Sequence, residues 1–430
     1  MKDYLKRLDG QSRRNFIANT AKACLGVSIL PGIGDKALAI TPGKRPATAR
    51  HVIYLYMGGG MSHVDTLDPK PETPAVQGPV KAIRTSADGI QLSEFLPKTA
   101  KQMHNATVIR SVSTNQGAHE QAGYLMHTSY VKRGTIVHPT LGSWVSKMSG
   151  KINNTLPENV RVNGGSNILG AGFLESKHGP LPIGNPSAGL QNSKMAEHLT
   201  NDRFGRRLLM AENLNENFLD YYPQRKVRAY SDLYKEATKL MKSEDLKAFD
   251  LEREPNSSHQ LYGQHRFGQG CLLARRLIEH KVRYVEVSMG GWDTHDDNFQ
   301  RVADNCIQLD QGLGGLLYDL ERRGLLKETL VVLTSEFGRT PDIVGARQGR
   351  NHWPKAFSAF MAGGGIKGGT VYGNSDADGK EVAEKMVKVP DLNATIAYAL
   401  GLPLTKVMYS PSGRPFTVAH KGEPVLDVLA

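Results

Sequence analysis

The sequence predicts an α/β fold with a large, mixed and mostly parallel sheet and a loop-rich insertion. Short, uninterrupted apolar runs separated by helical segments are typical of strands that helices bury on both faces. About 390 residues follow an N-terminal leader, enough for a large core in one or two domains. The apolar runs lie at residues 52–57, 106–109, 282–287, 329–334 and 356–362.

Helix-end signals mark the segments between these runs. Residues 309–323 end in two arginines and are followed by Gly324, while Pro390 opens the segment 392–400 that stops at Gly401. Alternation of strands and helices predicts a doubly wound sheet. Residues from about 150 to 260 differ, because glycine- and proline-rich loops precede a charged helical run at 232–254. We expect an insertion or cap there.

The N-terminus has the features of an export signal. Arg13 and Arg14 form a twin-arginine pair before an apolar stretch at 16–30, and residues 37–39 supply a small-x-small cleavage site. An amphipathic first helix would not require these features in this order. The sequence therefore predicts a signal peptide at 1–39, a mature domain at 40–430, export by the twin-arginine translocase, and a periplasmic or secreted bacterial protein. No mature run approaches the roughly 18 apolar residues of a membrane span.

Charge and cysteine content narrow the possible partners. Losing the leader's seven Lys or Arg and three Asp or Glu lowers the formal net charge from +12 to about +8. A basic chain suits anionic glycans or phosphate and sulfate esters, but its cations are scattered and no nucleic-acid motif occurs, so nucleic acid is not expected. In the mature chain, Cys271 and Cys306 can form a disulfide or remain buried thiols.

Polar clusters accompany all five apolar runs. Four clusters follow a run, at residues 58–65, 111–120, 290–295 and 335–341, and one precedes the fifth run, at 349–354. Ligands of open α/β sheets bind beyond the carboxyl ends of the strands. The joint placement of these clusters therefore predicts one site.

Histidines and carboxylates within these clusters predict a metal site. Asp293 and His295 can point at one ion, and Glu336, His352 and Asp65 add ligands from other strand ends. Such a mixed set suits zinc, manganese, iron or calcium. Alternatively, Asp293 caps a helix and His295 bonds to the backbone.

Three further side chains are candidates for substrate binding. Trp292 and Trp353 stand beside the candidate ligands, where they can stack on a sugar ring or pack as an inner wall. The guanidinium of Arg339 can hold a sulfate, phosphate or carboxylate, or form a salt bridge to Glu336 or Asp342.

With these residues in view, the chain resembles a bacterial secreted family, domain of unknown function 1501, which is related to sulfatases within the alkaline-phosphatase superfamily. The resemblance covers nearly the whole mature chain and rests on the motifs GGGMSHVDTLDPKP, IRSVSTNQGAHE, GGWDTHDDN, TSEFGRTP, GRNHW and DLNATIAYALGLP. It implies an alkaline-phosphatase-like three-layer sandwich whose relatives bind one or two metal ions and cleave phosphate or sulfate esters.

The motifs depart from those of the relatives in two ways. Glycines follow Met57 where relatives have a metal-binding Asp, and Phe337 replaces an Asn or His after the acidic residue. The sulfatase nucleophile position falls on His119, and no formylglycine motif exists, so a formylglycine sulfatase is not expected. His119 can be a metal ligand, a general base or a phospho-acceptor, with Ser113 or Thr114 as alternative nucleophiles.

Two functions remain open from the sequence. The first is an exported metal-dependent hydrolase acting on a phosphate, sulfate or glycan-linked ester, with His119 and Arg339 as catalytic residues. The second is a catalytically inactive relative that binds an envelope glycan or assists another exported protein. A phosphomutase shares the implied fold, but the export signal disfavours it.

Overall fold

A computed structural model describes residues 47–430 except 165–168, 192, 194–199 and 223–224. The predicted signal peptide, with Arg13 and Arg14, lies outside the described residues.

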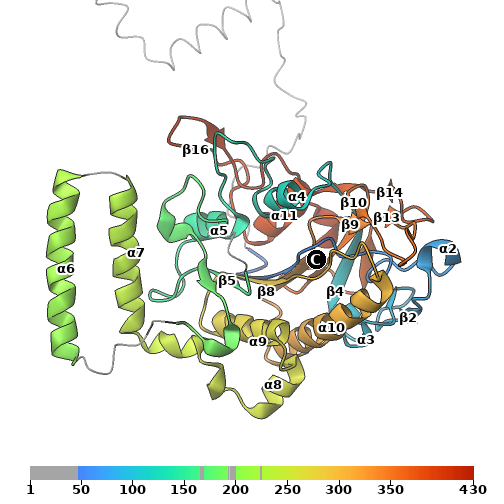
Figure 1. Cartoon of the computed structure of the whole chain (residues 1–430), viewed down its shortest axis with the longest axis horizontal. Coiled ribbons are helices and arrows are strands. Elements are labelled where there is room, and N and C mark those ends of the chain that lie inside the picture. The colour runs from blue at the N-terminus through green and yellow to red at the C-terminus, as the bar shows by residue number, and fades with distance from the viewer. Residues whose placement is uncertain (1–46, 165–168, 192, 194–199, 223–224) are drawn as a thin grey trace, which may run out of the picture. The chain divides into compact units, whose positions relative to one another are not determined.

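Nine strands of the described chain form one large sheet (Figure 1). Their spatial order is β12-β4-β11-β8-β1-β7-β5-β6, and β15 also pairs with β4. All five apolar runs form strands of this sheet, which confirms the prediction of an α/β fold with a large mixed sheet. The bounds are β1 (His51–Met57), β4 (Ala106–Ser113), β5 (Asn159–Val162), β6 (Leu181–Ile183), β7 (Tyr284–Met289), β8 (Thr329–Thr334), β11 (Phe357–Ala362), β12 (Thr370–Tyr372) and β15 (Val387–Lys388).

Strand β11 is the exception to the parallel arrangement. It pairs antiparallel with both β4 and β8, whereas the other pairings in the sheet are parallel. A mixed, mostly parallel sheet was predicted from the sequence, and β11 is the strand that makes it mixed. An apolar run reports burial on both faces and carries no information on strand direction. Because β11 is reversed, the segment that precedes it lies at the carboxyl ends of its neighbours.

Helices cover both faces of the sheet and give three layers (Figure 1). Alternate residues of β1 point to opposite faces, as a strand requires: Ile53 and Leu55 join one apolar cluster, and Val52 and Tyr54 join the other. The first cluster includes side chains of α9 (Arg266–Glu279) and α10 (Asn298–Arg322). The second includes side chains of α4 (His119–Thr128), α5 (Leu141–Ser149) and α11 (Val389–Ala399).

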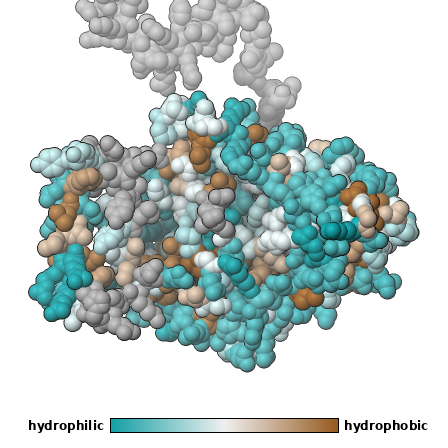
Figure 2. Space-filling model, in the orientation of Figure 1, coloured by the Kyte–Doolittle hydropathy of each residue, from teal (hydrophilic) through white to brown (hydrophobic). Residues whose placement is uncertain are grey.

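The segment from 150 to 260 contributes two strands of the sheet, β5 and β6, as well as helices. Helices α6 (Asn201–Tyr221) and α7 (Arg225–Met241) lie side by side (Figure 1), and α8 (Asn256–Tyr262) leads into α9. Figure 2 shows hydrophobic residues along α6, where Met210, Leu214 and Phe218 are exposed at helical spacing. We propose that the part beyond β6 is the cap predicted from the sequence.

Short elements complete the described chain. They are α2 (Pro74–Gln77), α3 (Pro97–Ala100), β2 (Ala82–Arg84), β3 (Gln91–Ser93), β9 (Gly338–Arg339), β10 (His352–Trp353), β13 (Asn374–Ser375), β14 (Val382–Glu384), β16 (Met408–Tyr409) and β17 (Pro415–Phe416). Cys271 and Cys306 are buried free thiols, so they do not form a disulfide. Among the helices of the described ranges, none has the length and apolar character needed to cross a bilayer.

Candidate metal site at the carboxyl edge of the sheet

Three histidines from separate segments converge on one carboxylate. His295 Nε2 lies 3.1 Å from Asp293 Oδ1, while the Nε2 atoms of His119 and His352 each lie 3.4 Å from the same oxygen. Asp293 and His295 follow β7, His119 begins α4, and His352 belongs to β10. The reversal of β11 explains how His352 reaches this edge. These four residues are called the histidine cluster below.

Close backbone approach at two glycines makes this convergence possible. Gly59, after β1, has φ +118°, and a Cβ atom there would lie 2.5 Å from the backbone nitrogen of Asp293. A Cβ atom on Gly349 would lie 1.6 Å from the carbonyl oxygen of His295. Both positions therefore require glycine, because any side chain would push the ligand-bearing segments apart.

A hydrogen bond fixes the second ring nitrogen of every histidine in the cluster. The Nδ1 atom of His119 donates to Glu336 Oε1 at 2.7 Å, that of His295 to Asn351 Oδ1 at 2.9 Å, and that of His352 to the Gly117 carbonyl at 2.8 Å. Oxygen acceptors place the proton on Nδ1 and leave Nε2 as the free ligand atom of the neutral ring. This arrangement is the usual support of metal-binding imidazoles.

Glu336 is buried and fully hydrogen-bonded behind His119. Its Oε1 accepts from His119 and from the Gly59 amide at 2.8 Å, and its Oε2 accepts from Tyr56 at 2.9 Å. Burial opposes ionisation, but these hydrogen bonds lower the pKa of Glu336 below its usual value. The hydrogen bond to Glu336 also raises the pKa of His119. Glu336 thus orients His119 and lies outside the converging ligand set.

Arg339 is buried within the protein and holds Asp293 in place. Its guanidinium donates to Asp293 Oδ1 and to the carbonyls of Gly59, Gly60 and Arg350. Burial raises the pKa of Asp293, but the bond from Arg339 outweighs it and brings the pKa to about 2. A fully buried guanidinium with these partners does not present a free fork to an anion. Its predicted role in anion binding is replaced by a positioning role.

The donor set fits a transition metal. Ligand atoms of His119, Asp293 and His352 lie within 4.8 Å of one another, and His119 Nε2 is buried without a hydrogen-bond partner. The Nε2 atoms of His295 and His352 are 3.0 Å apart. Two lone pairs at this distance repel each other unless a proton or cation lies between them. Zinc–nitrogen bonds of about 2.0–2.1 Å separate two tetrahedral ligands by roughly 3.3 Å, close to the observed spacing.

Asp65 lies outside the histidine cluster. It is fully buried, and its carboxylate forms an ion pair with Arg350, with Nε at 2.8 Å, and accepts hydrogen bonds from Arg350 Nη2 at 2.9 Å and from Asn298 at 2.8 Å. Its predicted role as a ligand is corrected to a structural one, because both oxygens already have buried partners. The sequence placed Asp65 only after a glycine-rich turn and could not show which way that turn leads.

The two tryptophans lie in different surroundings. Trp292 is fully buried in the apolar cluster below the sheet, so its predicted substrate role is corrected to core packing. Trp353 is half-buried, donates its indole N–H to the Lys380 carbonyl at 2.7 Å and has the Lys355 ammonium over its ring. Burial excludes Trp292 from stacking on a ligand, whereas the substrate-binding role of Trp353 stays a prediction.

The supporting residues Tyr56, Gly117 and Asn351 were not among the predicted site residues. Asn351 stands directly before His352, and Gly117 precedes His119 by two positions, so both lay inside recognised motifs. No local pattern marks a carbonyl or an amide as the partner of a distant imidazole. Ser113 and Thr114, the alternative nucleophiles, line a separate cavity.

Fold and site together define a class: an α/β protein with a mixed sheet and a histidine–carboxylate cluster at the carboxyl edge. The chain belongs to the family described as protein of unknown function (DUF1501), which it matches over residues 49–429. The resemblance predicted from the motifs is confirmed. A search of curated proteins found no match.

Solved structures similar to the chain include sulfatases and alkaline-phosphatase-superfamily proteins. The PsFucS1 sulfatase from Pseudoalteromonas sp. has a TM-score of 0.41 and 13% identity, over 82% of this chain and 68% of the other. The lipoteichoic acid synthase LtaP from Listeria monocytogenes has a TM-score of 0.39 and 9% identity, over 95% and 92%. The alkaline phosphatase from the Antarctic bacterium TAB5 has a TM-score of 0.35 and 11% identity, over 76% and 95%.

Proposed function

We propose that this protein is an exported metal-dependent hydrolase acting on a phosphate, sulfate or glycan-linked ester. The observation that carries the proposal is the convergence of three imidazole Nε2 atoms on Asp293 Oδ1, each ring fixed through Nδ1. With neutral rings, this tautomer set leaves the Nε2 lone pairs facing one another and the Asp293 carboxylate, and a bound cation would relieve their repulsion.

His119, His295, His352 and Asp293 would hold the metal. A set dominated by imidazole favours zinc, iron or manganese over calcium, which prefers oxygen ligands. When bound, the metal would act as a Lewis acid and lower the pKa of a coordinated water. Among the described hydrogen bonds, no serine, threonine or cysteine side chain contacts a histidine of the cluster. Water is therefore the proposed nucleophile, rather than a side-chain hydroxyl of this chain.

Glu336 and Arg339 would act by positioning. Glu336 holds the His119 ring in the tautomer that exposes Nε2, and Arg339 keeps Asp293 ionised and oriented. The cluster is partly open, since the side chains of His119, Asp293 and His295 are 36%, 47% and 46% exposed. A substrate ester can approach from this open side.

Export is a separate part of the proposal and rests on the leader. Arg13 and Arg14 would direct the folded chain to the twin-arginine translocase, with a periplasmic or secreted location as the result. Arg13→Lys with Arg14→Lys should retain the uncleaved precursor in the cytoplasm. N-terminal sequencing of the exported protein should place cleavage after residue 39, and unchanged export of the double variant would refute this route.

A catalytically inactive relative that binds an envelope glycan or assists another exported protein is the second candidate. The buried state of Arg339 favours it, because that arginine cannot reach a developing anionic charge. An inactive relative can still hold metal as a structural element, so metal content alone does not separate the two functions. Turnover does.

The test combines elemental analysis with a substrate screen. We expect about one equivalent of a transition metal in the purified protein, and metal-dependent cleavage within a panel of phosphate, sulfate and phosphonate esters. His352→Ala should lose both, while His104→Ala, a surface histidine bonded to Ser86, should lose neither. Metal bound without cleavage of any ester would favour the inactive relative. Absence of metal, with no effect of His352→Ala, would overturn both the site and the hydrolase.

A further inference from the structure

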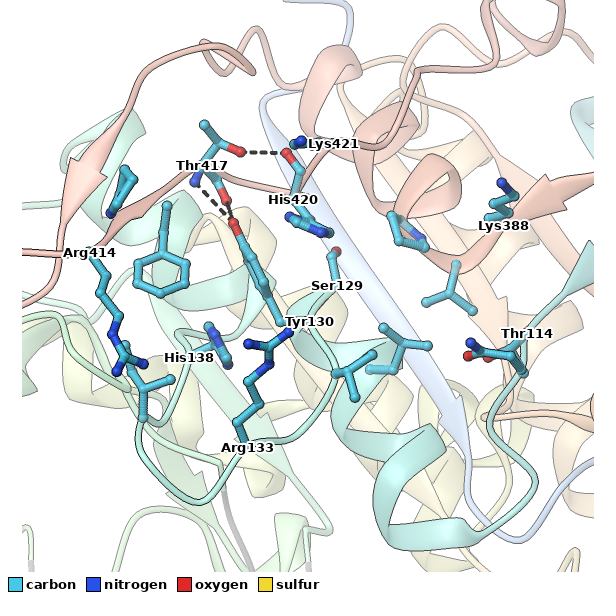
Figure 3. A pocket seen from close by; sticks show the side chains of 18 of the residues that line it. Thr114, Ser129, Tyr130, Arg133, His138, Lys388, Arg414, Thr417, His420 and Lys421 are labelled. Carbon is cyan, nitrogen blue, oxygen red and sulfur yellow. Dashed lines mark hydrogen bonds between the residues drawn. The ribbon is translucent and has the colours of Figure 1, made fainter.

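A cavity of about 930 Å³ lies beside α4. It is bounded by the C-terminal end of α4, the following loop, the start of α11 and the chain around β17. Figure 3 shows Arg414 to the left of Tyr130, Arg133 below it and Lys388 to the right. Cavities of this size hold ligands as large as a typical drug. In the described chain, Ser113, Thr114 and Asn115 also line it.

The charges that line this cavity have one sign. Arg133, Lys388, Arg414 and Lys421 are exposed cations, and the described lining contains no Asp or Glu. None of the four takes part in a salt bridge of the described chain, although Arg414 donates to Thr135 Oγ1 at 3.1 Å. Like charges gathered around one hollow repel each other. A bound anion would relieve this repulsion.

The pKa of His138, in the wall of the cavity, is lowered in part by this positive charge. Burial, followed by the positive charges of Arg133 and His420, lowers the pKa of His138 to about 4. A hydrogen bond of 2.8 Å joins His138 Nδ1 and the Tyr124 hydroxyl. The His138 ring also stacks on Tyr130, with the ring centroids 4.4 Å apart. His138 therefore stays neutral at pH 7, and the positive charge in the cavity comes from the four long side chains.

The remaining lining includes a hydrogen-bonded tyrosine and exposed apolar side chains. The Tyr130 hydroxyl donates to the Thr417 carbonyl at 2.7 Å, and Thr417 bonds to the His420 carbonyl, as Figure 3 shows. Val131, Met386 and Val407 line the cavity with exposed apolar surface. A ligand with both anionic groups and a flat or apolar face would match this mixture.

We infer that this cavity is a binding site for a compact polyanion, such as a small saccharide bearing several sulfate or phosphate groups. Four exposed cations without an acidic partner in the described chain provide the charge, and the exposed side chains of Val131, Met386 and Val407 provide an apolar surface for the scaffold. None of the four residues of the histidine cluster lines the cavity, and the two are linked through the backbone, where the Thr114 amide donates at 2.9 Å to the carbonyl of Pro354, two residues after His352. The inference goes beyond the proposed hydrolase function and does not require it.

Calorimetric titration with matched charged and neutral probes tests the inference. Sucrose octasulfate and inositol hexakisphosphate should bind the exported protein, and sucrose and inositol should not. The two anions separate sulfate from phosphate preference. Arg133→Gln and Lys421→Gln should each weaken binding by about fivefold or more, since each removes a charge-assisted contact. Both side chains are exposed, so these variants should fold normally.

Two controls separate a defined site from general charge attraction. Arg50→Gln removes the same charge from an exposed arginine that pairs with Glu328 at the amino end of β1, and it should leave affinity unchanged. His352→Ala should retain anion binding, because the histidine cluster is distinct from the cavity. Equal weakening by Arg50→Gln and Arg133→Gln, or loss of binding in His352→Ala, would overturn the inference. A bound anion should also raise the pKa of His138 in an NMR titration.

Discussion

At the scale of single residues, the histidine cluster depends on groups that lie behind the rings. Glu336, Asn351 and Gly117 each accept from one Nδ1 atom, and together they decide which nitrogen is free. Outer partners of this kind are as necessary to a metal site as the ligands, because they restrict ring rotation and tautomer. Glu336 is the one partner among them with a charge.

Glu336→Gln should lower metal affinity by about 10–100-fold, because a neutral amide is a weaker acceptor for His119 Nδ1 than a carboxylate. Competition with a chromogenic chelator measures the change. Glu328→Gln, which alters a surface carboxylate paired with Arg50, serves as the control and should bind metal like the unmodified protein. Unchanged affinity in Glu336→Gln would show that Glu336 does not support the site.

The buried pair of Asp65 and Arg350 leads to a prediction about stability. Asp65→Ala should lower the free energy of unfolding by about 3–5 kcal/mol, because it leaves the fully buried Arg350 guanidinium without its counter-ion. Urea denaturation measures the loss. Asp342→Ala, which breaks an exposed pair with Lys380, should cost about 0–1 kcal/mol. Lost metal with unchanged stability in Asp65→Ala would return Asp65 to the ligand set.

At the scale of elements, the reversal of β11 and the turn after β1 assemble the cluster. An antiparallel β11 brings His352 to the edge where β7 delivers Asp293 and His295. The turn after β1 contributes no ligand, but its glycines let the segment that carries Asp293 pack directly against it. These elements therefore determine the spacing of the ligands.

Gly59→Ala should reduce metal affinity and stability together. Its Cβ atom would meet the backbone of Trp292 and Asp293 at 2.5–2.9 Å, which forces the Asp293 segment outward. Gly89→Ala is the matched control, because Gly89 also has a positive φ, +74°, but has nothing within 4 Å of a Cβ atom. Both variants place alanine at a positive φ, which costs about 1 kcal/mol. Only Gly59→Ala adds the clash with the Asp293 segment, so only this variant should lose metal. Equal metal binding by the two variants would contradict the close-packing account.

At the scale of the whole molecule, a buried charge network joins the sheet to α4. Glu286 on β7 contacts His127 Nε2 at 3.2 Å and Arg161 Nε at 3.0 Å, and Arg161 belongs to β5. Burial raises the pKa of Glu286, but His127 and Arg161 together lower it to about 2. Ionised Glu286 therefore links three elements of the fold.

This network makes stability depend on pH in the acid range. The folded pKa of about 2 lies below the unfolded value of about 4.3, so the contribution of Glu286 is present above pH 4.3 and is lost as pH falls towards 2. Glu286→Gln should melt below the unmodified protein at pH 7, and the gap should narrow between pH 5 and pH 2. Thermal unfolding across this range measures the gap. A gap independent of pH would show that the carboxylate charge does not stabilise the fold.

The sequence could predict much of the fold because runs of apolar residues indicate which segments are buried. All five apolar runs are strands, and the helices at 309–323 and 392–400 end close to their terminal signals. Strands β5, β6, β12 and β15 escaped prediction, since they are short and lie among glycines and prolines. Short strands of this kind acquire their conformation from pairing with neighbours, which a few consecutive residues do not encode.

The sequence predicted which residues gather at the site better than it predicted the role of each residue. Asp293, His295 and His352 were expected to meet, and they do, because clusters at strand ends share one edge of the sheet. Asp65 and Arg339 carry the right chemistry but are buried with internal partners, and Trp292 is buried in an apolar cluster. Burial and hydrogen-bond partners are properties of the packed chain, so residue type alone could not separate these residues from true candidates.

By itself, the sequence determined the α/β class, the family and the edge of the sheet where polar side chains gather. Only the tertiary structure decided that β11 runs backwards, that His119 joins the cluster and that Glu336 and Arg339 stand behind it. The physical reason is the separation along the chain of the residues that interact. Apolar periodicity and strand-end composition act over a few residues, whereas His119 meets Glu336 across 217 positions of the chain and Arg350 meets Asp65 across 285.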